Sequence, residues 1–405
     1  MEQEAWSVVD RLVEAGYEAY LVGGCVRDRL LGRAIYDYDI TTSALPQEVM
    51  ELFPRTVPTG IHHGTVTVLM EQAQYEVTTF RTDGKYEDGR RPEQVTFVRS
   101  LREDLARRDF TINAMALGRD GTLHDPFGGQ DDLEKQVVRA VGEPRKRFEE
   151  DALRMLRGVR FAAQLGFVIE EDTLGAIAYE GHSLRQISRE RIREEWHKML
   201  LSASPDIAIE LLLQTETMRY VIARGPATEE PWRQAMHWTR RAPLDLAVRY
   251  AAVLTALAFE DPRVDKVLQD LKLSGQQKRD VRGALQVYAY GHPSAWKDSD
   301  WRHRFFQHGA DDVRRGVLLY ATIHEPERLG DWESEIATRQ AVQPLWSLQD
   351  LAADGPALIA AGVPVGPLIG RAQKRLAQLV LQEPERNVRE VLVQQALAWL
   401  EEGRL

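Results

Sequence analysis

The pattern of apolar residues changes near residue 140, and this change limits the folds open to the chain. Before it, short apolar runs typical of strands alternate with amphipathic runs typical of helices. From residue 149 onward, apolar residues recur at helical spacing with almost no strand signal. A chain of 405 residues is also longer than one hydrophobic core usually supports. The pattern therefore predicts an α+β head followed by an all-α remainder.

We expect four parts, and a mixture of helices and strands in the first. The predicted parts are residues 1–139, 140–198, 199–300 and 301–405. The helix predictions in the head cover residues 4–15, 26–31, 46–52 and 109–117. The strand predictions there cover residues 19–22, 38–42, 65–70 and 75–81. The Gly-, Pro- and charge-rich residues 82–93 are typical of a mobile loop.

Charge, cysteine content and the length of apolar runs indicate where the protein acts, but they say little about its function. The formal net charge of −10 argues against binding a polyanion through bulk charge, although local arginine clusters leave RNA binding open. Cys25 is the single cysteine, so no internal disulfide and no cysteine-based zinc site can form. No apolar run is long enough to cross a membrane, and the acidic, amphipathic N-terminus is not typical of a signal peptide. We therefore expect a soluble, cytoplasmic protein with no membrane segment.

Two carboxylates at Asp37 and Asp39 are the first candidates for chemistry. In a strand, residues two apart point to the same face, so both side chains would enter the same space. Two adjacent carboxylates repel unless they share a proton or a divalent cation, and oxygen donors of this kind suit Mg²⁺. The spacing alone is weak, because it recurs at residues 298–300 in polar surroundings that indicate only a loop.

The neighbouring sequence strengthens the interpretation of the acidic pair. An apolar strand enters Gly23-Gly24 and then a helix, a pattern that lets backbone N–H groups approach phosphate. Arg27 in the first turn could reach a triphosphate oxygen, and Asp28 is a candidate helix cap or a residue that orients Arg27. A third carboxylate, Glu76, lies in a strand prediction that could pair beside the acidic strand. Taken alone, an isolated strand glutamate more often faces solvent.

Taken together, these residues resemble the nucleotidyltransferase superfamily that contains DNA polymerase beta. Within it, the chain is similar to the class II tRNA nucleotidyltransferases and bacterial poly(A) polymerases. The segments that carry the resemblance occur in the family's order over residues 21–195. They are LVGGCVRD (21–28), YDYDITTSA (36–44), HHGTVTV (62–68), YEVTTFR (75–81), RRDFTINAMAL (107–117), DPFGG (125–129), EEDALRMLRGVRF (149–161) and ISRERIREE (187–195). The resemblance implies a polymerase-beta-like mixed sheet with helices in the head, then an all-α neck, body and tail.

The resemblance also implies roles for the residues of the head. Asp37 and Asp39 would hold two Mg²⁺ ions that activate the RNA 3′-hydroxyl and stabilise the leaving pyrophosphate. Glu76 would be a third, supporting acidic member of that catalytic site. Gly24 and Arg27 would contact the triphosphate.

Residues of the RRDFTINAMAL segment would complete the nucleotide contacts in the head. The resemblance implies that Arg108 binds the incoming nucleotide, and it makes Asp109 and Asn113 candidates for contact with its sugar. Considered without the resemblance, Arg107 and Arg108 indicate only a capped, basic helix start.

A second group of candidates falls on a predicted helix after residue 149. There Asp151, Arg154 and Arg157 would span about 120° of one face, which alone indicates an ordinary salt-bridged surface. The resemblance implies instead that Asp151 and Arg154 contact the base edge, accepting CTP and ATP and refusing UTP and GTP. It adds Arg157 and Arg160 to the nucleotide contacts, although Arg160 would lie about 180° from Asp151 on that helix.

Three activities within the family remain open: addition of C, C and A to the 3′ end of tRNA, addition of CC alone, and addition of A alone. The resemblance implies that CC-adding members lack a flexible loop after the third-carboxylate strand, and residues 82–93 supply one here. It also implies a basic C-terminal extension in poly(A) polymerases, whereas this chain ends in an acidic, apolar segment. We therefore expect full CCA addition with CTP and ATP, with addition of A alone as the alternative.

The helical half would bind the acceptor stem and elbow of tRNA. An RNA-binding protein with an inactive head and a small-molecule nucleotidyltransferase are weaker alternatives, because the predicted site residues are all present and the helical extension is long.

Overall fold

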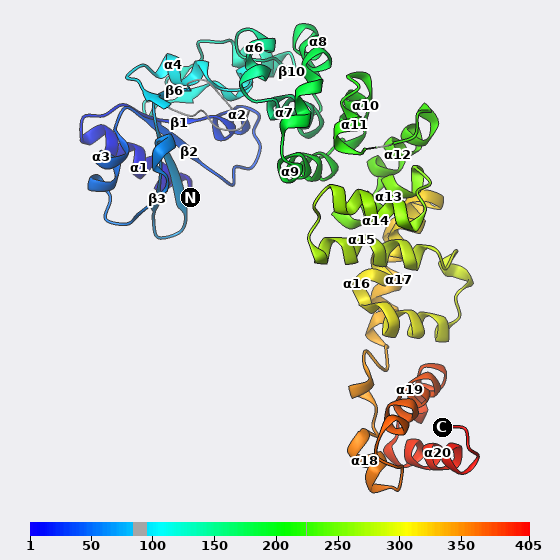
Figure 1. The fold of residues 1–405 in the computed structure, drawn as a ribbon. Helices are drawn as coiled ribbons and strands as arrows, with labels where there is room; N and C mark the ends of the chain where they lie inside the picture. The colour runs from blue at the N-terminus through cyan, green and yellow to red at the C-terminus, as the bar shows by residue number, and fades with distance from the viewer. Residues whose placement is uncertain (84–94, 224) are drawn as a thin grey trace. The chain divides into compact units, whose positions relative to one another are not determined.

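The computed structural model describes residues 1–83, 95–223 and 225–405 (Figure 1). The predicted loop at residues 82–93 lies outside the described residues except for its first two positions. The chain forms two compact units, Met1–Gly225 with Asp270–Lys272, and Pro226–Gln269 with Leu273–Leu405. Among the described residues, no helix combines the length and the apolar character that a membrane crossing requires.

A mixed seven-stranded sheet organises the head, with strand order β3-β4-β5-β2-β1-β8-β9. These strands are β1 (Ala19–Val22), β2 (Asp39–Thr42), β3 (Thr56–Gly60), β4 (Thr65–Leu69), β5 (Gln74–Thr79), β8 (Ala116–Leu117) and β9 (Leu123–His124). The pair β2–β5 is parallel and the other neighbours are antiparallel. A separate antiparallel ribbon joins β6 (Arg81–Asp83) and β7 (Val95–Phe97). The mixed sheet confirms the predicted α+β head.

Helices cover both faces of this sheet. The helices of the head are α1 (Glu2–Glu14), α2 (Gly24–Leu30), α3 (Pro46–Leu52) and α4 (Leu101–Ala106). Helices α1 and α3 pack against the strands on one side. On the other side, Leu101 and Leu105 of α4 pack with Val22, Phe80 and Ala116 in one buried cluster. The sheet is therefore buried on both faces at its centre, where the acidic strand lies.

The register of the central strands fixes which side chains share a face. Asp39 pairs with Val22 of β1 on one side and with Glu76 of β5 on the other. Thr41, two residues along β2, donates a hydrogen bond to Asp104 of α4 at 3.1 Å. Because side chains two apart share a face, Asp39 lies on the face that α4 covers.

One helix prediction in the head is wrong. Residues 109–117 form a short 3-10 turn, Thr111–Asn113, followed by strand β8. Ala116 and Leu117 pair with Val22 and Leu21 of β1. Pairing with an existing strand outweighs the modest helix propensity of this segment.

The rest of the first unit is mainly helical. Its helices are α5 (Gly129–Glu134), α6 (Pro144–Glu150), α7 (Leu153–Leu165), α8 (Glu171–Glu180), α9 (Arg189–Leu200), α10 (Pro205–Gln214) and α11 (Met218–Val221). A small parallel pair, β10 (Val137–Val138) and β11 (Val168–Ile169), adds a strand contact that the sequence pattern does not predict. Helix α7 packs against both α9 and α10.

The second unit contains helices and no strands among its described residues, as predicted. Its helices are α12 (Glu229–Arg241), α13 (Leu246–Ala256), α14 (Asp261–Asp270, whose last residue belongs to the first unit), α15 (Gly275–Tyr288), α16 (Asp298–His324), α17 (Leu329–Ala341), α18 (Gly355–Ala360), α19 (Pro367–Gln382) and α20 (Arg389–Glu401). The loop prediction at residues 298–300 is wrong, because they form the first turn of α16. There Oδ2 of Asp300 accepts the N–H of Lys297 at 2.8 Å, a capping contact.

Candidate active site

A tight turn at Gly23 and Gly24 joins β1 to α2 and lies at the centre of the candidate site. Gly23 has φ +79°, a left-handed conformation that residues with a side chain rarely adopt. A Cβ added there would lie 3.0 Å from Nη1 of Arg108 and 3.9 Å from Oδ2 of Asp39. Because position 23 has no side chain, the guanidinium of Arg108 and the carboxylate of Asp39 can both lie close to the backbone there.

Three carboxylates meet here: Asp39 begins β2, Glu76 lies opposite it in β5, and Asp37 lies just before β2, not in a strand as the shared-face prediction requires. Burial raises the pKa of Asp39 to about 6, the negative charge of Asp37 and of Glu76 adds to the rise, and Arg108 opposes it. A divalent cation relieves this kind of repulsion, and hard oxygen donors suit it. The described residues contain no group of three or more His, Cys, Asp or Glu side chains arranged to hold a metal ion.

Arg108 is held by a buried carboxylate that the sequence analysis did not single out. Asp104 is fully buried, and its Oδ2 lies 3.5 Å from Nη2 of Arg108. Its Oδ1 accepts a hydrogen bond from Nε of Arg107 at 2.9 Å. Burial works to raise the pKa of Asp104, but the charges of Arg107 and Arg108 outweigh it and lower the pKa. Asp104 thus stays ionised and fixes the position of Arg108.

Arg27 points back toward the helix start, where Asp28 orients it. Its Nε and Nη2 donate to the two carboxylate oxygens of Asp28 at 3.0 and 2.9 Å. Its Nη1 donates to Oδ1 of Asn113 at 2.7 Å. Of the two interpretations of Asp28, the structure therefore supports orientation of Arg27 and not a helix cap.

Asp109 is buried and faces the neck helix α7. Its Oδ2 accepts Nε of Arg157 at 2.7 Å, and its Oδ1 accepts the N–H of Phe110 at 2.9 Å and Nδ2 of Asn113 at 3.2 Å. Burial alone would raise the pKa of Asp109, but the charge of Arg157 and the hydrogen bonds from Asn113 and Arg157 lower it. This carboxylate therefore joins head to neck, and its contact with a sugar stays a prediction.

The predicted helix face containing Asp151 is wrong. Helix α6 ends at Glu150, Asp151 is extended with φ −145°, and α7 begins at Leu153. Oδ1 of Asp151 accepts the N–H of Leu153 at 3.0 Å, which stops the helix from running through. Its Oδ2 binds Nη2 of Arg191 at 2.7 Å.

Arg154 and Arg160 have partners of their own. Nη1 of Arg154 donates to Oε2 of Glu150 at 2.6 Å, and Nη2 donates to the carbonyl of Arg107 at 3.1 Å. Nε of Arg160 lies 2.7 Å from Oε2 of Glu195 on α9, and both side chains are at most 10% exposed. The arginines of α7 are thus held in place, and their contacts with a nucleotide stay predictions.

Cys25 lies beside this site and should be unreactive in the folded protein. Its Sγ donates to the carbonyl of Val22 at 3.3 Å, and burial, with the charge of Asp39, raises the pKa of the thiol to about 11. We expect iodoacetamide at neutral pH to alkylate the native thiol at least about 100-fold more slowly than the urea-unfolded thiol, because little thiolate forms. As the pH rises from about 9 through 11, the thiol ionises first in the unfolded state, so the free energy of unfolding falls over this range. Rapid alkylation of the native protein, followed by mass spectrometry, would contradict this placement.

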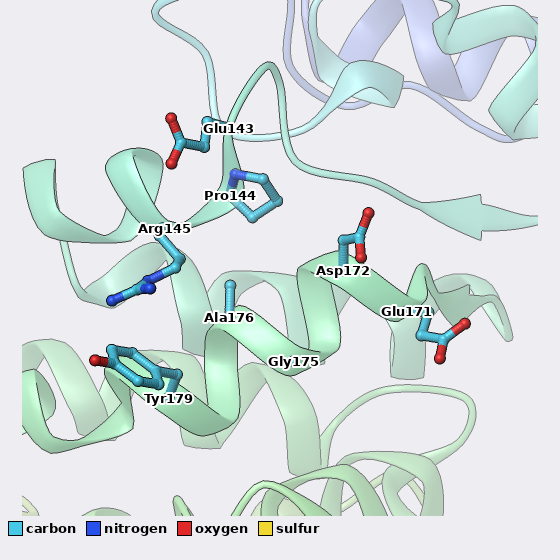
Figure 2. A pocket seen from close by; sticks show the side chains of 8 residues that line it. All are labelled: Glu143, Pro144, Arg145, Glu171, Asp172, Gly175, Ala176 and Tyr179. Carbon is cyan, nitrogen blue, oxygen red and sulfur yellow. The ribbon is translucent and has the colours of Figure 1, made fainter.

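A surface pocket elsewhere in the first unit does not include the predicted site residues. It lies between the start of α6 and α8 and is lined by Glu143, Pro144, Arg145, Glu171, Asp172, Gly175, Ala176 and Tyr179. Figure 2 shows the guanidinium of Arg145 beside the ring of Tyr179. The Cζ atom of Arg145 lies 3.8 Å from the centre of that ring. Arg145 also pairs with Glu180 at 3.2 Å. These contacts stabilise the α6–α8 packing.

Four residues that were not predicted from the sequence contact the predicted site residues. Asp104 and Glu195 pair with Arg108 and Arg160, Glu150 pairs with Arg154, and Phe161 lies against several arginines. Ser100 followed by Glu103 indicates the helix start that places Asp104. No local pattern distinguishes the others from surface charges or core residues.

Comparison with protein families agrees with this arrangement. Residues 19–139 match the model described as "Poly A polymerase head domain". Residues 166–230 match "Probable RNA and SrmB-binding site of polymerase A", and residues 246–396 match a tRNA nucleotidyltransferase domain 2 model. The fold and the site together define a nucleotidyltransferase of the poly(A) polymerase type.

Individual relatives narrow the class. The chain is 41% identical to the CCA-adding enzyme of Geobacillus thermodenitrificans, over 99% of this chain and 96% of that one. It is 40% identical to the CCA-adding enzyme of Leuconostoc mesenteroides, over 93% and 92%. The crystal structure of the Bacillus stearothermophilus CCA-adding enzyme in complex with CTP matches with a TM-score of 0.85 and 36% identity, over 99% and 98% of the two chains. The chain belongs to the CCA-adding enzyme family.

Proposed function

We propose that this enzyme adds C, C and A in sequence to the 3′ end of tRNA, using CTP and ATP and no nucleic-acid template. The observation that carries the proposal is the meeting of Gly23, Arg108 and Asp39 at one turn, with Asp37 and Glu76 close enough to influence Asp39. Such a site offers cation and phosphate contacts side by side. Similarity to CCA-adding enzymes along almost the whole chain selects the substrate.

Nucleotide transfer requires a bond from the RNA 3′ oxygen to the α-phosphorus, while the bond to pyrophosphate breaks. Mg²⁺ held by Asp37 and Asp39, with Glu76 in support, would polarise the 3′-hydroxyl and neutralise charge on the pyrophosphate. Gly24 and Arg27 bind the triphosphate. Their placement at the start of α2 supports these roles, since backbone N–H groups at a helix start attract phosphate.

The remaining nucleotide contacts come from two segments that meet at the ion pair of Asp109 and Arg157. Arg108 binds the incoming nucleotide, and Asp109 contacts its sugar. Arg157 and Arg160 of α7 bind the nucleotide from the neck. Their fixed guanidinium groups support this assignment, because pre-positioned donors lose little freedom on binding.

Selection between nucleotides is assigned to Asp151 and Arg154. A carboxylate accepts a hydrogen bond from the exocyclic amine of cytosine or adenine, while an arginine donates to the adjacent ring acceptor. Uracil and guanine lack an amine there and would leave the carboxylate unpaired. The two residues lie at the junction of α6 and α7.

Replacing Arg154 by alanine should relax this selection. The change removes a donor that is only 8% exposed, so we expect discrimination against UTP to fall about tenfold to a hundredfold. The measurement is kcat/KM for CTP, ATP and UTP on tRNA lacking its last nucleotides. Arg145→Ala, which removes an arginine of α6 that is 49% exposed, is the matched control and should leave selection unchanged. Unaltered refusal of UTP in Arg154→Ala would place base recognition elsewhere.

The helical parts are proposed to bind tRNA. We assign residues 1–139 to the catalytic head, 140–198 to a neck that recognises the base, and 199–300 and 301–405 to a body and tail that bind the acceptor stem and elbow. The family models matched at residues 166–230 and 246–396 support an RNA role for these helices. A tRNA substrate and a single cysteine are consistent with a cytoplasmic enzyme.

A gel assay tests the proposal directly. Purified protein, Mg²⁺ and tRNA transcripts ending before CCA, after C, or after CC are each given CTP, ATP or both. Extension of every transcript to CCA, with no further addition, is the expected result. Addition of a single A to the CC-ending transcript alone would make the protein an A-adding enzyme, and unlimited A addition a poly(A) polymerase.

A further inference from the structure

One buried phenyl ring on α7 lies among three guanidinium groups. Phe161 is 5% exposed, and Cζ of Arg160, Arg27 and Arg157 lies 4.1, 5.1 and 5.5 Å from the centre of its ring. At separations within about 6 Å a cation is attracted to the electron-rich ring. Phe110 contacts the same ring edge-on, with centroids 5.8 Å apart, and fixes its orientation.

Three cations gathered around one ring repel one another unless they are compensated. Each has a carboxylate of its own, in the pairs Arg27–Asp28, Arg157–Asp109 and Arg160–Glu195. The carboxylates neutralise the charge of the three arginines but do not use all of their N–H donors. Nη1 of Arg157 and Nη2 of Arg160 have no hydrogen-bond partner within the described part of the chain. The cluster is therefore formed before any ligand arrives and still has hydrogen bonds to give.

The three arginines come from two parts of the first unit. Arg27 belongs to α2 of the head, whereas Arg157 and Arg160 belong to α7. Carboxylate pairs hold each arginine separately, whereas all three arginines contact the ring of Phe161. Removing it would leave the guanidinium groups paired yet free to move apart.

We propose that Phe161 is a positioning residue for the triphosphate: its ring holds Arg27, Arg157 and Arg160 together as one anion-binding set. This inference rests on the proposed function, since it names how the same site holds its nucleotide. The ring touches no substrate in this scheme and acts through the arginines. Binding of the triphosphate, and not of the nucleoside, should therefore depend on the electron density of the ring.

Fluorination of the ring tests this without changing its shape. Trifluorophenylalanine incorporated at position 161 keeps the packing but removes most of the attraction for cations. We expect the Kd for CTP to rise about tenfold, whereas the Kd for cytidine stays unchanged. Phe161→Leu should raise the KM for CTP and ATP in the same way, with a smaller effect on kcat. Equal weakening of CTP and cytidine, or no weakening of CTP, would overturn the proposal.

Phe167 provides the matched control. Its ring is also 5% exposed, and no arginine contacts its face among the described residues. Trifluorophenylalanine at position 167 should leave both Kd values unchanged. The unmodified protein is first tested in the gel assay: if it adds neither C nor A, the proposed function fails, whereas normal addition with CTP binding insensitive to fluorination refutes only the role of Phe161.

Discussion

Asp39→Ala should abolish nucleotide addition while leaving the binding of tRNA nearly unchanged. Asp39 is the first residue of the central strand β2 and lies opposite Glu76. Its carboxylate therefore lies close to the charges of Asp37, Glu76 and Arg108. Removing it takes away a proposed ligand of the divalent cation, and we expect kcat to fall by at least about a thousandfold. Single-turnover extension of a CC-ending tRNA measures the loss, and a gel-shift assay measures tRNA binding.

The control for this variant is a carboxylate outside the site. Asp300→Ala removes an exposed helix-capping carboxylate in the second unit and should leave kcat unchanged. Substantial Mg²⁺-dependent activity in Asp39→Ala would show that the cation is held by other residues. Loss of tRNA binding in the same variant would indicate a folding defect.

Asp109→Ala should lower the free energy of unfolding by more than the control substitution described below. The change leaves Arg157 without Oδ2, which its Nε and Nη2 both contact, and removes Oδ1, which accepts the N–H of Phe110 and Nδ2 of Asn113. Breaking a buried ion pair costs about 3–5 kcal/mol, and the 36% exposure of the Arg157 side chain places the expected loss near 3 kcal/mol. Because the pKa of Asp109 is lowered in the folded state, its contribution is present at neutral pH and is lost as the pH falls below the ordinary value of 3.8.

Urea unfolding at pH 7 measures this loss of free energy. Glu229→Ala is the matched control, since it removes a carboxylate from an exposed pair with Arg233 and should change stability by a few tenths of a kcal/mol. Asp109→Asn keeps one acceptor oxygen, so its loss of unfolding free energy should lie between those of Asp109→Ala and Glu229→Ala. A change below about 1 kcal/mol in Asp109→Ala would mean that the ion pair does not join head and neck.

Local patterns in the sequence predict the strands that carry Asp39 and Glu76, two of the proposed catalytic carboxylates. The strand at residues 19–22 and the helix at residues 46–52 have the predicted bounds, and the predicted pairing of Glu76 beside the acidic strand is confirmed. These elements depend on local periodicity and on turn residues such as Gly23. Such signals survive in a single sequence because neighbouring residues produce them.

The failures arise where a distant partner decides the outcome. Residues 116–117 become a strand because β1 is available to pair with them, and their local propensity does not show this. Asp151 leaves the helix because its carboxylate accepts the N–H of Leu153 and binds Arg191, 40 residues away. Asp104 looks like an ordinary helix acid until Thr41, from a strand far earlier in the chain, is placed beside it.

The ion pair between Asp109 and Arg157 joins residues 48 positions apart, whereas Asp39 begins β2 and Asp37 lies two residues before it. The proposed metal ligand Asp39 is thus fixed by the head's own sheet, whereas Arg154, which we propose to contact the base, also depends on the carbonyl of Arg107 in the head. Accuracy and chemistry are therefore separable. Damage to the docking of α7 would leave an enzyme that still joins nucleotides but chooses them poorly.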